Sequence, residues 1–378
     1  MHRRHQAPAY LLTTLVTLSC ASLVHAQATA PAGEPAPAPS TPATPELAVP
    51  AEVRPVAVEP DGLDLENAER LKGLKSVVLA GVALYVVTEA SGSANAGAVF
   101  RDRSMAYVST SLKVTGLDNA RLQALADAAY DQTAAALKAR GLEVVSIDAY
   151  KTSPEYAELA ALGDKQPLPV DASAGKGIVF SAHGLPLFHL DEQAWLPRAV
   201  GGLFGAKVDD PYVSLGDKMG GGFRRPKIEM ALDKVSKSTG AAVVMGRIVL
   251  AAAQVKASGG AFALTASTSA RDTLVMPTWT NRLWVRTAGG DRARVSLKFP
   301  LVSETPPGQI VDVTSTATKV GDAAATLLSV AAALSGVGRG STSSTKELEM
   351  RTSPAWFDAV ARPQVGAAVE ALAKGLAP

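Results

Sequence analysis

The sequence predicts an α+β fold of mixed α/β character, in which an antiparallel-rich sheet packs with helices. Runs rich in β-branched residues alternate with segments whose apolar residues recur at helical spacing. Several strand-like runs follow one another across short glycine-containing turns, as antiparallel neighbours do. Neither pattern occurs in the first 60 residues. The folded region is therefore expected to be residues 61–378, either as one domain or as two units, 61–165 and 166–378.

Residues 1–26 have the layout of a secretory signal peptide. An arginine pair precedes the apolar run Leu11–Val24, and a small-x-small cleavage site ends at Ala26. Cleavage there removes Cys20, the only cysteine, so the mature chain is expected to have no disulfide and no thiol ligand. Lipidation of Cys20 is the alternative, although the residues before it fit the lipidation motif poorly.

Residues 27–60 are rich in proline and alanine and lack apolar periodicity, so they predict a disordered linker. The chain has 37 basic and 35 acidic residues, and the leader carries two arginines and no acid, which leaves 35 of each. Balanced charge gives no broad footprint for nucleic acid, so no nucleic-acid partner is expected. Leader and linker together predict a periplasmic or secreted protein, with association with the outer membrane as the alternative.

Two strands are predicted to open the folded region. Leu74–Glu89 is rich in β-branched residues, as buried strands are, and Met105–Gly116 alternates between polar and apolar residues. The stretch ASGSANAG that follows the first strand predicts a flexible turn.

A helix is predicted next, because Asp118 can cap its start and Gly141 can end it. Its apolar face is expected to consist of Leu122, Leu125, Ala129, Thr133 and either Ala136 or Leu137. The run LEVVSIDAY (residues 142–150) predicts a third strand. A short helix with Pro154 in its first turn follows.

The second half predicts a helix that Pro226 opens and Gly240 closes, then a long strand over residues 241–257. Gly246 in that strand indicates a bulge or a close approach. The remaining predicted elements are a strand running back over residues 259–270, a hairpin of residues 281–288 and 292–304, and closing helices over residues 317–336 and 353–377.

One resemblance rests on this order of elements. The helix LQALADAAYDQTAAALKARG (residues 122–141), the strand run after it, and the later stretch KSTGAAVVMGRIVLAAA (residues 237–253) resemble periplasmic domains of curli-secretion lipoproteins and the amino-terminal domains of TolB. The sequence departs from that pattern in the long stretch between Tyr150 and Arg225. The resemblance implies an assembly or transport accessory rather than an enzyme.

The stretch SAHGLPLFHLDEQ (residues 181–193) is the strongest candidate for chemistry. Two histidines and a carboxylate can form a zinc site with an open position, and His183, His189 and Asp191 are weak candidates for such a site. A Gly-x-Pro turn separates the histidines, and no HExxH helix is present. Ser181 with His183 as its base is a hydrolase alternative, but no G-x-S-x-G elbow occurs. We therefore expect a folded loop without metal, cofactor or catalytic residue.

Three further stretches invite a function. Met219–Lys227 places glycines and basic residues before a helix, where anions bind, but it lacks the GK[ST] ending of a P-loop and predicts a mobile loop. Gly336–Ser344 follows a helix rather than a strand and predicts a flexible helix exit. Asp322–Gly338 is apolar but short of a bilayer span, so we expect a buried packing helix, with a membrane-inserting element as the alternative.

Three functions are compatible with these features. We expect a non-catalytic exported envelope protein that acts through protein–protein contacts. The first alternative is an outer-membrane transport or assembly accessory of the curli-secretion type, with Gly259–Pro277 as the best candidate for a membrane-facing hairpin. The second alternative is a histidine-dependent hydrolase.

Overall fold

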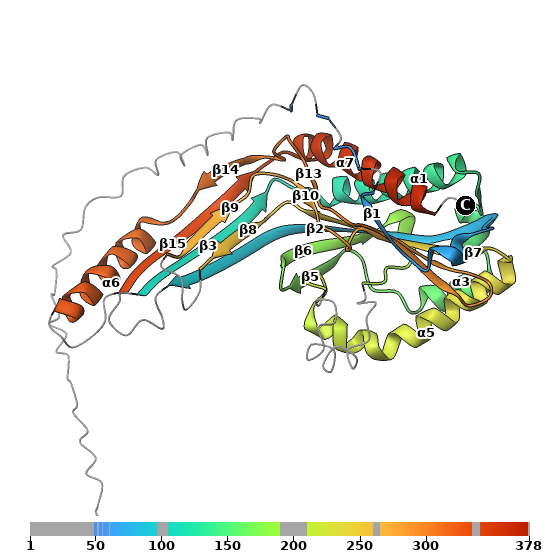
Figure 1. The fold of residues 1–378 in the computed structure, drawn as a ribbon, viewed down its shortest axis with the longest axis horizontal. Coiled ribbons are helices and arrows are strands. Elements are labelled where there is room, and N and C mark those ends of the chain that lie inside the picture. Colours follow the sequence, from blue (N-terminus) through green and yellow to red (C-terminus); the bar gives the residue numbers. More distant parts are fainter. Residues whose placement is uncertain are drawn as a thin grey trace, which may run out of the picture. The chain divides into compact units, whose positions relative to one another are not determined.

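The computed structural model describes residues 49–50, 53–54, 56–59, 61–96, 105–189, 210–259, 265–334 and 341–376. These residues build a thirteen-stranded mixed sheet, a separate two-stranded sheet and six α-helices (Figure 1). The strands are β1 (Leu63–Glu66), β2 (Ser76–Ala96), β3 (Met105–Thr115), β4 (Glu143–Val144), β5 (Leu168–Ala172), β6 (Gly175–Ser181), β7 (Ala242–Ala251), β8 (Val255–Ser258), β9 (Ser267–Ala270), β10 (Val275–Met276), β11 (Arg282–Arg286), β12 (Arg292–Leu297), β13 (Leu301–Val302), β14 (Gln309–Asp312) and β15 (Ser341–Arg351). The helices are α1 (Asn119–Ala139), α2 (Ile147–Lys151), α3 (Pro154–Ala160), α5 (Leu215–Thr239), α6 (Thr316–Leu334) and α7 (Pro354–Gly375), with 3-10 turns η1 (Ala68–Leu71) and η2 (Ala182–Gly184).

The main sheet runs in the order β1-β12-β11-β7-β2-β3-β15-β14. Along this path the β2–β7 and β3–β15 pairs are parallel and the other neighbours are antiparallel. Strand β2 also pairs with β4 and β6, and β7 also pairs with β10. The predicted fold class, a mixed α/β protein with an antiparallel-rich sheet and packed helices, is confirmed.

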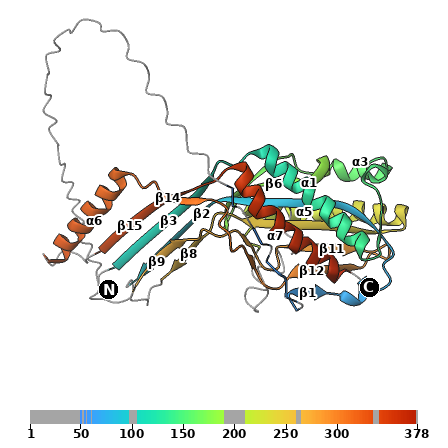
Figure 2. The ribbon, with the colours of Figure 1, turned by 90° about the horizontal axis from the view of Figure 1, so that it is seen from above.

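Helices cover both faces of the sheet. Figure 1 shows α1 and α7 on one face and α5 with α3 on the other, and Figure 2 shows α1 and α7 side by side. The side of the sheet below α1 and α7 is apolar. Buried Leu79, Leu283 and Val295 belong to the same core cluster as Leu125 of α1 and Val369 of α7. This apolar side leaves the opposite side of β7, β11 and β12 free to carry polar residues.

Several local predictions are confirmed. The carboxylate of Asp118 accepts the amide of Ala120 and caps α1, and Gly141 follows the helix with a φ of 84°. The close approach predicted at Gly246 is also present, because a Cβ placed there would lie 3.0 Å from a methyl group of Leu283. The predicted hairpin is formed by β11 and β12, which pair antiparallel, with Arg282 opposite Ser296 at one end and Arg286 opposite Arg292 at the other.

The ASGSANAG stretch is not the predicted turn, because β2 continues through it to Ala96. Its small residues serve close packing instead. A Cβ at Gly92 would lie 2.8 Å from a methyl group of Val255 in the β8–β9 layer. Glycine and alanine therefore let two layers of strands approach each other, which a local turn propensity does not anticipate.

Two other boundaries were predicted wrongly. The run over residues 142–150 gives only the two-residue strand β4, because the hydroxyl of Ser146 accepts the amide of Ala149 and starts helix α2. Pro226 lies inside α5 rather than at its start, and the helix begins at Leu215. The expected mobile loop over Met219–Lys227 is therefore helical. Burial of α5 against the sheet outweighs the local cost of its proline.

Helix α6 is not the buried packing helix that its composition predicts. Val320, Leu327 and Leu328 are 62%, 71% and 73% exposed. The stretch Gly336–Ser344 was expected to be a flexible exit from a helix, but its last residues are a strand, because β15 begins at Ser341.

The linker and the two-unit division also differ from expectation. Residues 1–48, which hold the predicted signal peptide and most of the linker, lie outside the described residues. Near its end the linker packs on α7, where Gln364 accepts the amide of Val56 and donates to the carbonyl of Arg54. No division falls at residues 165–166, because β6 pairs with β2 and β7 pairs with β2 within one sheet.

Candidate functional site

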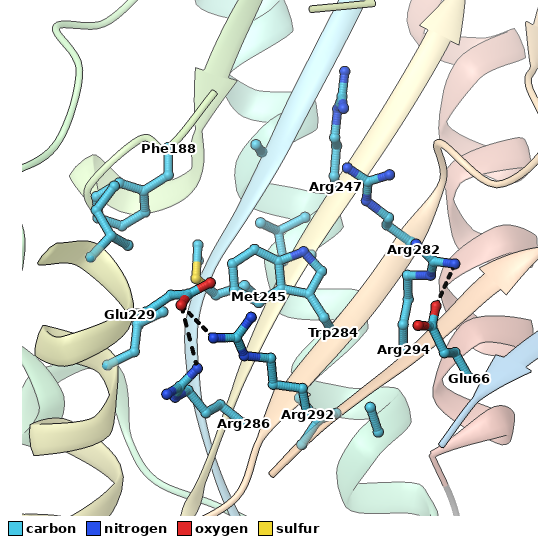
Figure 3. A pocket seen from close by; sticks show the side chains of 18 of the residues that line it. Glu66, Phe188, Glu229, Met245, Arg247, Arg282, Trp284, Arg286, Arg292 and Arg294 are labelled. Carbon is cyan, nitrogen blue, oxygen red and sulfur yellow. Dashed lines mark hydrogen bonds and ion pairs between the residues drawn. The ribbon is translucent and has the colours of Figure 1, made fainter. Parts of the chain in front are cut away.

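A cavity of about 590 Å³ lies between α5 and the polar side of β7, β11 and β12 (Figure 3). Strand alternation builds its floor. Arg282, Trp284 and Arg286 are two residues apart on β11 and therefore share one side of the sheet. In register on β12, Arg294 lies opposite Trp284 and Arg292 lies opposite Arg286.

Strand β7 continues this arrangement on the other side of β11. Met245 is in register with Trp284, and Arg247 is in register with Arg282. Figure 3 shows the Trp284 indole between Met245 and the arginines, with the Phe188 ring at one side. The floor thus combines guanidinium groups with an apolar centre.

Helix α5 supplies the opposite wall and a shared carboxylate. Ile228 and Leu232 line the cavity together with Glu229. Glu229 pairs with Arg225 at 2.8 Å, forms an ion pair with Arg292, and lies 4.0 Å from Arg286. One carboxylate therefore holds three arginines at this end of the cavity.

The arginines of β11 and β12 have further acidic partners. Arg286 also binds Asp233 at 2.6 Å, and this hydrogen bond lowers the pKa of the Asp233 carboxyl. Arg294 pairs with Glu66 of β1 at 2.6 Å. The Glu66 side chain is 56% exposed, so this pair lies where the cavity meets solvent.

The deep end of the cavity is a buried ionic cluster. Asp210 is 1% exposed and lies 2.5 Å from Arg247 and 3.7 Å from Arg282. Burial disfavours the charged form of Asp210, but the two guanidinium groups outweigh this effect and lower its pKa. Among the described residues, this one carboxylate therefore faces two guanidinium groups.

The described residues that line the cavity include six arginines and three carboxylates. The arginines are Arg225, Arg247, Arg282, Arg286, Arg292 and Arg294, and the carboxylates are Asp64, Glu66 and Glu229. With the adjacent Asp210 and Asp233, the described part of the chain places six arginines and five acids in and around the cavity. A concave, partly apolar site of this volume with convergent donors has the character of a ligand site for an organic anion.

The two histidines of the strongest sequence candidate have different surroundings. The His183 ring lies 2.9 Å from Asp131 and packs edge-on against Tyr130, both on α1. The backbone amide of His183 donates to Asp127 at 2.7 Å. His183 therefore joins η2 to α1.

His189 is 3% exposed and packs edge-on against Tyr85 of β2, with ring centroids 5.6 Å apart. Burial, and then the positive charge of Arg247, lower the pKa of His189 to about 3. Its Nε2 has no hydrogen-bond partner among the described residues. Because its ring is neutral and buried, His189 has the character of a core residue beside the cavity rather than of a proton carrier.

The third weak metal candidate, Asp191, lies outside the described residues, as does Glu192. Within the part of the chain that the structure describes, no group of three or more His, Cys, Asp or Glu side chains is placed to hold a metal. Ser181 lines the cavity, but its hydroxyl donates to the carbonyl of Pro186 at 3.4 Å. The absence of a catalytic metal stays a prediction.

The residues of the arginine cavity were not identified as a site from the sequence, although the sequence contains a pattern that could have indicated them. The run RLWVR (residues 282–286) and the run RARV (residues 292–295) alternate charged or aromatic residues with apolar ones. This pattern predicts one polar side, which is usually assigned to solvent. The stretch Met219–Lys227, which the sequence offered as an anion-binding candidate, contributes a residue to the cavity. Arg225 lines it, whereas Arg224 binds Asp164 at 2.7 Å.

No protein family, no curated protein and no solved structure matches this chain. Among the described residues, no helix is long and apolar enough to cross a membrane.

Proposed function

We propose that this protein is a non-catalytic binding protein of the cell envelope that holds a small organic anion in the arginine cavity. The lining of the cavity carries this proposal, since six arginines and three carboxylates surround Trp284. A guanidinium presents paired N–H donors that match a carboxylate or a phosphate, and it keeps its charge at every physiological pH.

The apolar centre defines the rest of the ligand. Trp284, Met245 and Phe188 offer an indole, a thioether and a phenyl ring beside the guanidinium groups. Such surfaces favour a flat ring or a short hydrocarbon chain. We therefore expect a ligand with one phosphate or carboxylate group on an apolar body.

The contacts of the acidic residues support binding rather than catalysis. Glu66 and Glu229 are held by arginines, so they act as charge partners rather than as free bases. Export to the envelope is part of the proposal and rests on the leader sequence. Protein partners there, and the resemblance to curli-secretion domains, remain predictions.

Isothermal titration with matched probes tests the proposal. Phenyl phosphate and benzoate should bind, whereas benzyl alcohol and benzylamine, which have the same ring, should bind at least tenfold more weakly. Arg294→Gln should weaken phenyl phosphate roughly 10- to 100-fold, the range of one charged hydrogen bond. Trp284→Leu should weaken all ring-containing anions. Because Glu66 is half exposed, Arg294→Gln leaves a hydrated carboxylate and should preserve the fold.

A matched control distinguishes the cavity from general charge. Arg362 lies on α7 and pairs with Asp358 in the same way at 2.9 Å. Arg362→Gln should leave phenyl phosphate binding unchanged. Equal losses in the Arg294 and Arg362 variants, or equal binding of the anionic and neutral probes to the wild type, would show that the arginines are structural ion pairs only.

A further inference from the structure

Helix α6 has an inverted arrangement of polar and apolar sides. Its residues closest to the sheet are Thr318, Asp322, Thr326 and Ser329, which follow one another at steps of four, four and three. Steps of three and four place residues on one side of a helix. Helices that pack on a core usually turn an apolar side inward, and α6 does the opposite.

The polar side of α6 caps the edge of the sheet. On one side β15 pairs with β3 over its whole length, and on the other β14 pairs with Leu348–Arg351. The amide of Ser343 donates to the Thr326 hydroxyl at 3.4 Å, and the amide of Thr345 donates to the Asp322 carboxylate at 2.6 Å. An exposed strand edge with unmet donors invites aggregation, so these contacts stabilise the end of the sheet.

This capping turns the apolar side of α6 outward. At about 100° per residue, Val320 and Leu327 lie roughly 150° from Asp322, nearly opposite the sheet. The exposed positions also include Ala323, Ala324, Ala325 and Leu328. From Ala323 to Leu334 the sequence has no charged residue. The outward side of α6 is therefore convex, apolar and uncharged.

We infer that this outward side of α6 binds a lipid bilayer surface, with the helix lying in the plane of the membrane. A lipid surface needs no complementary groove, and each apolar side chain that enters it adds to the binding. A second copy of the chain is a less suitable partner for this side of α6. A 19-residue helix is about 28 Å long and offers a strip about 10 Å wide, or roughly 280 Å². Stable interfaces bury roughly 800 Å² per partner.

Vesicle flotation tests the inference on the chain that begins at Gln27, which lacks the apolar leader and keeps the whole described region. The probe is phosphatidylcholine vesicles, because the uncharged outward side of α6 should bind without anionic lipid. We expect the wild type to float with the vesicles. Leu327→Ser/Leu328→Ser should lower the partition coefficient roughly 100-fold, since two large apolar side chains are lost. Both positions are exposed, so the variant should keep the wild-type melting temperature.

A control pair removes exposed apolar residues elsewhere. Met230 on α5 and Phe299 after β12 are 62% and 47% exposed. Met230→Ser/Phe299→Ser should float like the wild type. A wild-type protein that stays at the bottom of the gradient would overturn the inference, as would equal flotation of the Leu327/Leu328 variant. A dimer in light scattering that this variant dissociates, with no flotation of the wild type, would identify α6 as a contact between copies instead.

Discussion

Acid should destabilise this protein through His189. The folded state holds this ring neutral, because burial and the nearby Arg247 lower its pKa to about 3. In the unfolded chain the ring has the ordinary histidine pKa of about 6.5. As the pH falls below about 6.5, the unfolded chain gains a proton at this position and the folded chain does not. At this position the free energy of unfolding is therefore unaffected above pH 6.5, and it decreases progressively as the pH falls toward 3.

The magnitude follows from the two pKa values. Each pH unit between them costs about 1.4 kcal/mol, so the loss at pH 5 is about 2 kcal/mol. His189→Phe removes the titrating group and keeps a ring edge for Tyr85, which lies 5.6 Å away between centroids. The difference in unfolding free energy between pH 7 and pH 5 should shrink by about 2 kcal/mol in this variant.

Urea unfolding at the two pH values measures this difference. All other titrating groups are common to both proteins and cancel in the comparison. His183 provides an independent background, because its ring contacts Asp131 rather than Tyr85. His189→Phe should have the same effect with and without His183→Asn. Identical pH dependence in the wild type and in His189→Phe would refute the reasoning, since it would mean that the folded protein protonates His189 as readily as the unfolded chain.

Three more outcomes are expected. Gly246→Val should lower the free energy of unfolding in urea by roughly 1–3 kcal/mol, because the new Cβ would press on Leu283. Gly321→Ala should not lower it, because a Cβ at that position meets nothing within 4 Å. Asp118→Ala should cost about 1 kcal/mol through loss of the α1 cap, and an unchanged midpoint would contradict that role. Added zinc should not bind stoichiometrically by metal analysis; zinc that binds to the wild type and is lost in His183→Ala/His189→Ala would show that the histidines form a metal site.

The ends of α1 and the alternation of the β11–β12 hairpin were predictable because they depend on neighbouring residues. Asp118 and Gly141 mark the two ends of α1 as expected, and the β11–β12 hairpin lies where the alternating residues indicate. At the ASGSANAG stretch, where a turn was expected, a distant contact decided the outcome. Strand β2 continues through Gly92 because the β8–β9 layer packs against it, and that layer comes more than 150 residues later in the chain.

The sequence by itself determined which residues share a side of each element. It placed Arg282, Trp284 and Arg286 together, and it placed Asp322 and Thr326 together. Only the tertiary structure decided what faces each side. Helix α5 covers the arginines and makes a cavity, and the edge of β15 takes the polar side of α6 and turns its apolar side outward. The reason is physical: periodicity is a local property, whereas burial of a side depends on elements far away in the chain.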